Sequence, residues 1–262
     1  MIDMGNDILN ITQANNKDAK IYLGTSGLVL PVPNKSFYPE AFKTASRLHY
    51  YGHLYNSIEI NSSFYKMPRA ITVARWAEET GKDFKFTFKL LRDITHTKGL
   101  IFDPYQLEHF MLAISAVGQK KGCLLIQLPP SQNISAFSQF QRLIDLIREY
   151  DTVDWNLAIE FRHRSWYTTE VKDWMNDKEL ALVFHDHRSQ SSPLWDLEAN
   201  FSYLRFHGPT GDFRGSYDEA ILTEYASYVQ EWLAQEKDVY IYFNNTMGAA
   251  TENLLTLRNL LT

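Results

Sequence analysis

Eight short apolar segments recur along the chain, separated by helical patterns or polar loops. The segments cover residues 21–24, 57–61, 84–89, 123–128, 157–161, 181–185, 203–206 and 239–243. Helical patterns occupy residues 39–51, 68–79, 104–118, 135–149, 169–176, 218–235 and 248–261. Strands that alternate with helices form parallel sheets, and eight such units in about 250 residues are typical of a (β/α)8 barrel. The sequence therefore predicts a single α/β barrel of the TIM type over residues 20–262.

A doubly wound open sheet has the same alternation of strands and helices, so it is the alternative architecture. Open sheets that bind dinucleotides carry a Gly-x-Gly-x-x-Gly turn after the first strand. Here the first strand leads only into Gly24-Thr25-Ser26-Gly27, a fragment of that pattern, and the barrel is favoured. We expect residues 1–19 to form a short polar leader rather than a signal peptide, because they are rich in Asn and contain no long apolar run.

Composition limits the classes of partner. The 262 residues are 45% hydrophobic and carry a net charge of −5. An acidic chain lacks the positive surface that binds nucleic acid or anionic membranes non-specifically, and no stretch approaches the ~20 apolar residues of a membrane span. The single cysteine, Cys123, lies in an apolar run. We expect it to be a core residue of a protein in a reducing compartment, the cytoplasm.

The strand predicted at 157–161 carries an unusual pair of charges. Leu157, Ile159 and Phe161 share one face, which leaves Glu160 and Arg162 on the opposite face. A strand that ends in charged residues and leads into a turn is how α/β enzymes present side chains to a ligand. The pair therefore indicates that this face lines a polar space.

The same alternation assigns an inward face to the other strands. Large apolar residues should face the helices, so the polar residues between them should face the barrel lumen. At the carboxyl ends of the strands this inward set is Glu59, Asn61, Lys89, Gln127, Glu160, Arg162, Arg205, His207 and Asn244. On the sixth strand, either His185 or Asp186 points inward. Functional residues of this fold lie at that end of the barrel, so we expect the site there.

Two interpretations of these charges are open. Arg162 with Glu160, and Arg205 with Glu59, would neutralise each other as buried ion pairs. However, burying so many charges costs several kcal/mol per ion unless a ligand or water offsets the cost. Lys89 and the two arginines outnumber the two glutamates by one. A slightly cationic pocket rich in donors suits a phosphate or a carboxylate.

Two loops, 207–217 and 244–248, follow the last two predicted strands and are rich in Gly and Asn. Barrels often bind phosphate at these loops, because glycines let backbone N–H groups approach and a helix N-terminus adds positive potential. Gly208, Tyr217 and Asn245 would then contact the ligand, with Asp186 from the loop before. The same residue types are also typical of ordinary turns.

A metal site is the rival hypothesis. Side chains of the types that bind Mn²⁺ or Zn²⁺ are Glu59, Glu160, His185, Asp186, His187 and His207. They show no His-x-x-x-His or Cys-x-x-Cys spacing, and three cations lie among them, so no residue is assigned as a metal ligand. Glu59 with Glu160 would also suit a glycosidase if their carboxyl groups lie ~5–10 Å apart.

Ordered blocks over roughly residues 21–260 resemble the YecE-like family, the domain of unknown function 72. The blocks are Gly24-Thr25-Ser26-Gly27, Phe37-Tyr38-Pro39, Ile58-Glu59-Ile60-Asn61 with Phe64-Tyr65, Lys89 with Ile94-Thr95-His96, Gln127-Leu128-Pro129-Pro130, Glu160-Phe161-Arg162-His163 with Ser165-Trp166, Arg205-Phe206-His207-Gly208 and Phe243-Asn244-Asn245. The resemblance implies a single TIM-type barrel without an established activity. Leu28 departs from the family, which usually places Trp after the first block.

We therefore expect a barrel, uncharacterised in its activity, that binds a small anionic or polyhydroxy ligand at its C-terminal mouth. Glu160, Glu59 or His207 would act as general acid or base. The ligand would contact Lys89, Arg162, Arg205, Asn61, Gln127, Asn244, Asn245, Gly208, Tyr217 and Asp186. The sequence requires no cofactor, although a divalent metal fits the rival hypothesis. The alternatives are a metal-dependent phosphoesterase or isomerase and a non-catalytic ligand-binding protein; substrate, reaction and oligomeric state are not specified.

Overall fold

The computed structural model describes residues 19–188 and 190–262. Within these ranges, eight parallel strands form one sheet in the order β1-β8-β7-β6-β5-β4-β3-β2. They are β1 (Ile21–Thr25), β2 (Ser57–Ile60), β3 (Lys85–Lys89), β4 (Lys121–Leu128), β5 (Asn156–Phe161), β6 (Ala181–His185), β7 (Phe201–Phe206) and β8 (Asp238–Phe243). Each predicted strand is confirmed to within two residues at either end. The leader expected over residues 1–19 lies outside the described residues, apart from Ala19.

The first and last strands of this order also meet, which makes the sheet a nearly closed barrel. The Gly27 N–H donates to the Glu59 carbonyl over 2.7 Å, and Ser26 and Glu59 form an isolated parallel bridge. A Cβ atom at Gly24 would lie 2.0 Å from the Ser57 carbonyl oxygen, so the close approach of β1 to β2 requires glycine. The predicted TIM-type barrel is therefore confirmed, and an open sheet is not formed.

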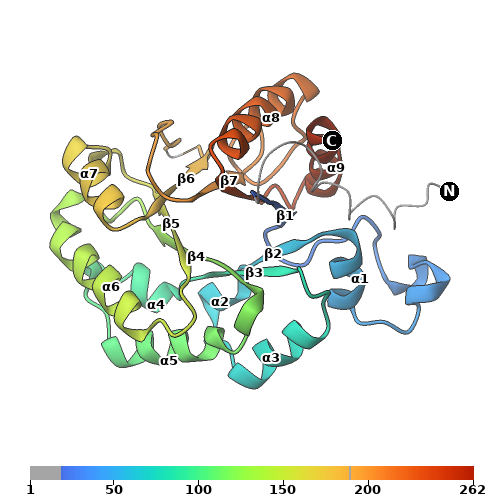
Figure 1. Cartoon of the computed structure of the whole chain (residues 1–262), viewed down its shortest axis with the longest axis horizontal. Coiled ribbons are helices and arrows are strands. Elements are labelled where there is room, and N and C mark those ends of the chain that lie inside the picture. The colour runs from blue at the N-terminus through green and yellow to red at the C-terminus, as the bar shows by residue number, and fades with distance from the viewer. Residues whose placement is uncertain (1–18, 189) are drawn as a thin grey trace.

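In Figure 1, the longer helices lie around the outside of the strands, and α8 and α9 pack side by side. The helices are α1 (Arg47–Leu54), α2 (Ser62–Tyr65), α3 (Ala70–Glu78), α4 (Arg92–Thr95), α5 (Pro104–Ser115), α6 (Phe137–Tyr150), α7 (Thr169–Asp177), α8 (Glu219–Ala234) and α9 (Ala250–Leu261). The single-turn helices α2 and α4 were not predicted, because four residues are too few to show helical periodicity. No helix of the described residues is long and apolar enough to cross a membrane.

The helix predicted over residues 39–51 is wrong in its extent. Glu40–Phe42 forms only a 3-10 turn, and α1 begins later and continues to Leu54. The Ser46 hydroxyl accepts a hydrogen bond from the His49 N–H over 3.0 Å, which caps the helix at this point. An N-cap in the middle of an apolar pattern thus divides a stretch that periodicity alone reads as one helix.

The barrel has two apolar clusters, one between the strands and the helices and one inside the lumen. The outward side chains of the strands pack against the helices in one large core. A second cluster fills the lower lumen with Tyr22, Cys123, Leu125, Ala158, Ala181, Val183, Ala199, Phe201, Tyr203, Tyr240 and Tyr242. Cys123 is fully buried there, as its apolar context predicted. Because this cluster fills the lower lumen, the polar residues at the carboxyl ends of the strands lie above an apolar floor.

Candidate functional site

The predicted inward faces are confirmed strand by strand. On β2, Ile58 and Ile60 pack in the helix-facing core, and Glu59 between them is fully buried inside the barrel. On β6, Ala181 and Val183 belong to the cluster in the lumen, and His185 continues their face. The ambiguity on β6 is therefore resolved in favour of His185, whose Nε2 lies 3.1 Å from the Phe161 carbonyl oxygen.

Glu59 is bound on both carboxylate oxygens. Its Oε1 accepts from Arg205 Nη2 over 2.9 Å and from the Ser26 hydroxyl. Its Oε2 accepts from the Tyr203 hydroxyl over 2.5 Å and from Arg205 Nε over 3.1 Å. The Glu59 side chain has no exposed area. The carboxylate thus lies beneath the guanidinium of Arg205, which partners it.

Glu160 is likewise fully buried and binds both arginines. Arg162 forms an ion pair with Oε1, and Arg205 Nη1 donates to Oε2 over 3.1 Å. Burial alone would raise the pKa of Glu160, but Arg162 and Arg205 outweigh burial and hold that pKa well below its usual range. Both ion pairs considered from the sequence are therefore formed, and Arg205 joins them into one network.

His207 accepts hydrogen bonds from both guanidinium groups. Its Nε2 lies 3.0 Å from Arg162 Nη2 and 3.1 Å from Arg205 Nη1. A guanidinium can only donate, so Nε2 carries no proton and the neutral ring holds its proton on Nδ1. Asp186 Oδ1 lies 3.4 Å from that Nδ1. Burial, followed by the charge of Arg205, lowers the pKa of His207 well below its usual value.

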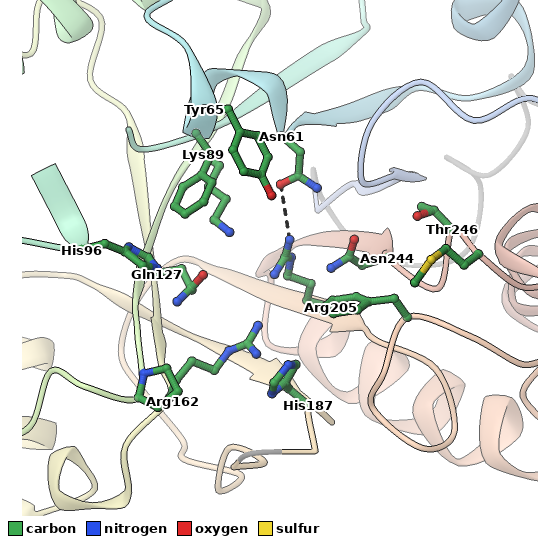
Figure 2. A pocket seen from close by; sticks show the side chains of 14 residues that line it. Asn61, Tyr65, Lys89, His96, Gln127, Arg162, His187, Arg205, Asn244 and Thr246 are labelled. Carbon is green, nitrogen blue, oxygen red and sulfur yellow. Dashed lines mark hydrogen bonds between the residues drawn. The ribbon is translucent and has the colours of Figure 1, made fainter. Parts of the chain in front are cut away.

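A cavity of about 470 Å³ opens above this network. It is lined by Asn61, Phe64, Tyr65, Lys89, His96, Gln127, Pro130, Arg162, His187, Arg205, Phe213, Asn244, Thr246 and Met247. Figure 2 shows the Lys89 amine and the two guanidinium groups pointing toward the same space. No Asp or Glu of the described residues is among those that line it. The cavity wall is therefore cationic, although the network beneath contains both signs of charge.

Lys89 differs from the arginines because it has no acidic partner among the described residues. Its Nζ lies 4.0 Å from the centre of the Phe64 ring and makes no hydrogen bond or ion pair within the described residues. Burial, followed by the charge of Arg205, lowers the pKa of Lys89 to about 7. Burial, followed by Lys89, likewise lowers the pKa of His96 to about 4. Near neutral pH the His96 ring is therefore uncharged and Lys89 exists partly as the free amine.

Several predicted ligand contacts lie in the loops instead of the cavity wall. The Gly208 N–H donates to the Tyr217 hydroxyl over 2.6 Å, and that hydroxyl donates to Asp186. Asn245 Nδ2 donates to Asn253 Oδ1 over 3.0 Å, and the Gly248 N–H donates to the Asn245 carbonyl over 2.9 Å. These donors are occupied by partners in the loops and on α9, as in ordinary turns. No observation therefore favours a phosphate cradle at these glycines.

Of the predicted site residues, six line the cavity, and Glu59, Glu160 and His207 lie beneath it. The six are Asn61, Lys89, Gln127, Arg162, Arg205 and Asn244. The lining residues that were not assigned to a ligand site are Phe64, Tyr65, His96, Pro130, His187, Phe213, Thr246 and Met247. Tyr65 and Met247 are large apolar side chains with 76% and 57% exposure, respectively. Most of these lining residues lie in the loops a few positions after a strand. Strand alternation assigns faces only within the strands, so it did not identify them.

The acidic and histidine side chains do not assemble a metal site. Within residues 19–188 and 190–262, no three His, Cys, Asp or Glu side chains are grouped so that they could hold a metal ion. The carboxylates of Glu59 and Glu160 bind guanidinium groups, and His207 Nε2 is used in the same way. The donor set of the cavity therefore suits an anion better than a cation.

The comparisons with known proteins agree with this fold. The sequence model of the family described as "Protein of unknown function DUF72" matches residues 22–262. The UPF0759 protein YunF of Bacillus subtilis is 25% identical over 260 residues, covering 87% of this chain and 89% of YunF. YecE of Escherichia coli K12 is 26% identical over 117 residues, covering 45% of this chain and 42% of YecE.

Two solved structures of DUF72 family proteins have a similar fold. The protein from Enterococcus faecalis superposes with a TM-score of 0.75 at 19% identity, covering 94% of this chain and 99% of that protein. The protein from Thermotoga maritima gives a TM-score of 0.72 at 23% identity, covering 92% and 99%, respectively.

Proposed function

This chain belongs to the DUF72 family, whose description assigns no activity, and we propose from its site that the cavity binds a small ligand with a phosphate or carboxylate group. One observation carries the proposal. Lys89, Arg162 and Arg205 line the cavity, whereas the carboxylates that partner the two arginines lie beneath it. The positive charge faces the open space, and the negative charge faces away from it.

The cavity also retains unused hydrogen-bond donors. All three nitrogen atoms of the Arg205 guanidinium donate hydrogen bonds within the network. Arg162 Nη1, in contrast, makes no hydrogen bond within the described residues. The Asn61 Oδ1 accepts from Arg205 Nη2 over 3.5 Å, which leaves the Asn61 amide N–H groups for a ligand. The side-chain amides of Gln127 and Asn244 are buried and unpartnered among the described residues. Several donors around one cationic space are the pattern that anion sites show.

Apolar side chains form part of the same wall. Phe64, Tyr65, Phe213 and Met247 contribute aromatic and thioether surface. The volume of about 470 Å³ lies within the range of small-molecule sites, and such sites combine apolar walls with a few placed polar groups. We therefore propose an organic anion as the ligand, with its charged group on the cations and its carbon skeleton against these rings.

The acid–base roles predicted for Glu59, Glu160 and His207 stay predictions. The geometry favours another role for these three residues, since each is buried beneath the cavity and binds a guanidinium group. We propose that they hold Arg162 and Arg205 in position for the ligand. Among the groups that line the cavity, Lys89, His96 and His187 are able to exchange a proton with a ligand.

Calorimetric titration with sulfate tests the proposal. Sulfate should bind, and Arg162→Ala should weaken binding about tenfold or more, because a hydrogen bond to a charged group contributes about 1.5–3 kcal/mol. Gln127→Leu, which leaves the ionic network intact, should weaken binding by a smaller factor. Arg75→Ala on α3 is the control, because its side chain is 66% exposed outside the cavity. Sulfate binding that is absent, or unchanged in both cavity variants, would contradict the proposed function.

A further inference from the structure

Lys89 occupies a position that anion binding alone does not explain. It ends β3, only 8% of its area is exposed, and its Nζ faces the cavity above the Phe64 ring. Arg162 and Arg205 already supply two cations to the same space. A buried lysine normally has an acidic partner, because desolvation of an unpaired ammonium is costly.

The acidic groups nearby are committed to other residues. Arg205 binds both oxygens of Glu59, and the two oxygens of Glu160 bind Arg162 and Arg205. Lys89 is therefore surrounded by two cations and by carboxylates that are already neutralised. Such an environment favours the neutral amine over the ammonium, and a neutral amine is a nucleophile.

We propose that Lys89 forms an imine with the aldehyde or ketone group of an anionic ligand. The Lys89 nitrogen adds to the carbonyl carbon, and the carbonyl oxygen takes up a proton, giving a carbinolamine. That adduct loses water to give the C=N bond, so both hydrogens of the amine leave with the carbonyl oxygen. No oxidant or reductant is consumed. The inference rests on the proposed function, because the cations must hold the anionic group of the same ligand.

The surroundings of Lys89 support this chemistry. The charged and titratable groups that act on its amine are Arg205, Glu160, Glu59 and Arg162, and His96 and His187 line the cavity with it. With its pKa lowered to about 7, a large fraction of Lys89 is unprotonated at neutral pH. The arginines stay charged under the same conditions, so a carbonyl-bearing anion meets both a nucleophile and its counter-charge.

Reductive trapping tests the inference. The intact protein is incubated at pH 7 with glyoxylate, which carries an aldehyde and a carboxylate, together with cyanoborohydride, and modified lysines are located by peptide mass spectrometry. Lys89 should be modified at least about tenfold faster than Lys85, because Arg162 and Arg205 would hold the carboxylate of glyoxylate beside the Lys89 amine. Lys85 begins the same strand, and its Nζ donates to the Gln119 carbonyl over 2.9 Å outside the cavity. Sulfate should protect Lys89 and leave Lys85 unaffected.

Two variants separate the inference from the proposed function. Lys89→Arg should lose the fast-reacting site, because a guanidinium does not form the imine. Lys85→Arg, outside the cavity, should retain both sulfate binding and the fast-reacting site. Equal modification of Lys89 and Lys85 in a protein that still binds sulfate would overturn the imine and leave the anion site standing. If the unsubstituted protein does not bind sulfate, both the imine and the proposed function are overturned.

Discussion

Arg205 on β7 binds Glu59 on β2 across the interior of the barrel, with Nη2 2.9 Å from Oε1 and Nε 3.1 Å from Oε2. These two strands are not neighbours, since β1 and β8 lie between them in the closed sheet. The same guanidinium also reaches Glu160 on β5. One side chain therefore connects three strands and partners both buried carboxylates.

Replacing Arg205 by Met should destabilise the protein by about 3–5 kcal/mol, because removal of one partner leaves a buried charge uncompensated. Glu59 would lose its guanidinium, whereas Glu160 would retain Arg162. Urea unfolding followed by circular dichroism measures the change. The double variant Glu59→Gln with Arg205→Met removes both charges and should recover part of the loss. A single variant that loses less than about 1 kcal/mol would show that the pair is not a buried charge network.

Sulfate affinity should fall as the pH rises through about 7. An anion beside Lys89 favours its ammonium form, so binding is strongest below the pKa of the free protein, about 7, and weakens above it. The decrease should be at most about tenfold per pH unit, because one proton is linked to binding. The lowered pKa of His96, about 4, places its titration well below this range.

Sulfate is the appropriate probe because it does not titrate over this pH range, unlike phosphate. Lys89→Met should bind sulfate more weakly at pH 6 and show no pH dependence between 6 and 9. Lys89→Arg should also lack the pH dependence while retaining affinity, since arginine stays charged. A pH dependence that persists in both variants would assign the titration to another group.

Tyr217→Phe should destabilise the protein by about 1–3 kcal/mol, the cost of leaving buried polar groups without partners. The Tyr217 hydroxyl accepts from the Gly208 N–H over 2.6 Å and donates to Asp186. Tyr228→Phe is the matched control, because its exposed hydroxyl donates to Glu224 on the surface of α8. Chemical denaturation of both variants measures the difference. Equal changes would mean that the loop after β7 does not depend on this hydroxyl.

Gly24→Ala should prevent the close approach of β1 to β2. The added Cβ would lie 2.0 Å from the Ser57 carbonyl oxygen, a backbone atom that cannot move alone. We expect a loss of about 1–3 kcal/mol or more in thermal or urea unfolding, as for overpacked cores. Gly81→Ala is the control, since a Cβ atom at that position would meet nothing within 4 Å among the described residues, and its change should stay within about 0.5 kcal/mol. Similar stability in both variants would contradict the contact between these strands.

Local patterns were sufficient for the strands and for their inward faces. Alternation is a property of neighbouring residues, so Glu59, Lys89 and Arg205 could be assigned to the lumen before any tertiary contact was known. Helix boundaries were less predictable, and the stretch 39–51 shows why. A capping hydrogen bond from the His49 N–H to the Ser46 hydroxyl decides where α1 begins, and periodicity does not record that bond.

The loops also show where local patterns end. Gly208 and Asn245 suit either a phosphate site or a turn, and only the partners of the Gly208 N–H and of the Asn245 side-chain amide distinguish the two. Gly208 is bonded by Tyr217 of its own loop, and Asn245 Nδ2 donates to Gly215 of the other loop and to Asn253 on α9, so these donors have partners without a ligand. Phe64 and Met247 line the cavity but lie in segments that follow strands, so strand alternation could not identify them.

The sequence by itself determined the barrel and the set of charges that its lumen would contain, because both follow from residue spacing along one strand at a time. Only the tertiary structure decided how those charges are arranged in depth. Arg205 takes its partners from β2 and β5, which leaves the Lys89 amine facing the cavity without an acidic partner among the described residues. Pairing of this kind depends on side-chain directions and on distances between strands that are remote in sequence, and neither is encoded in a local pattern.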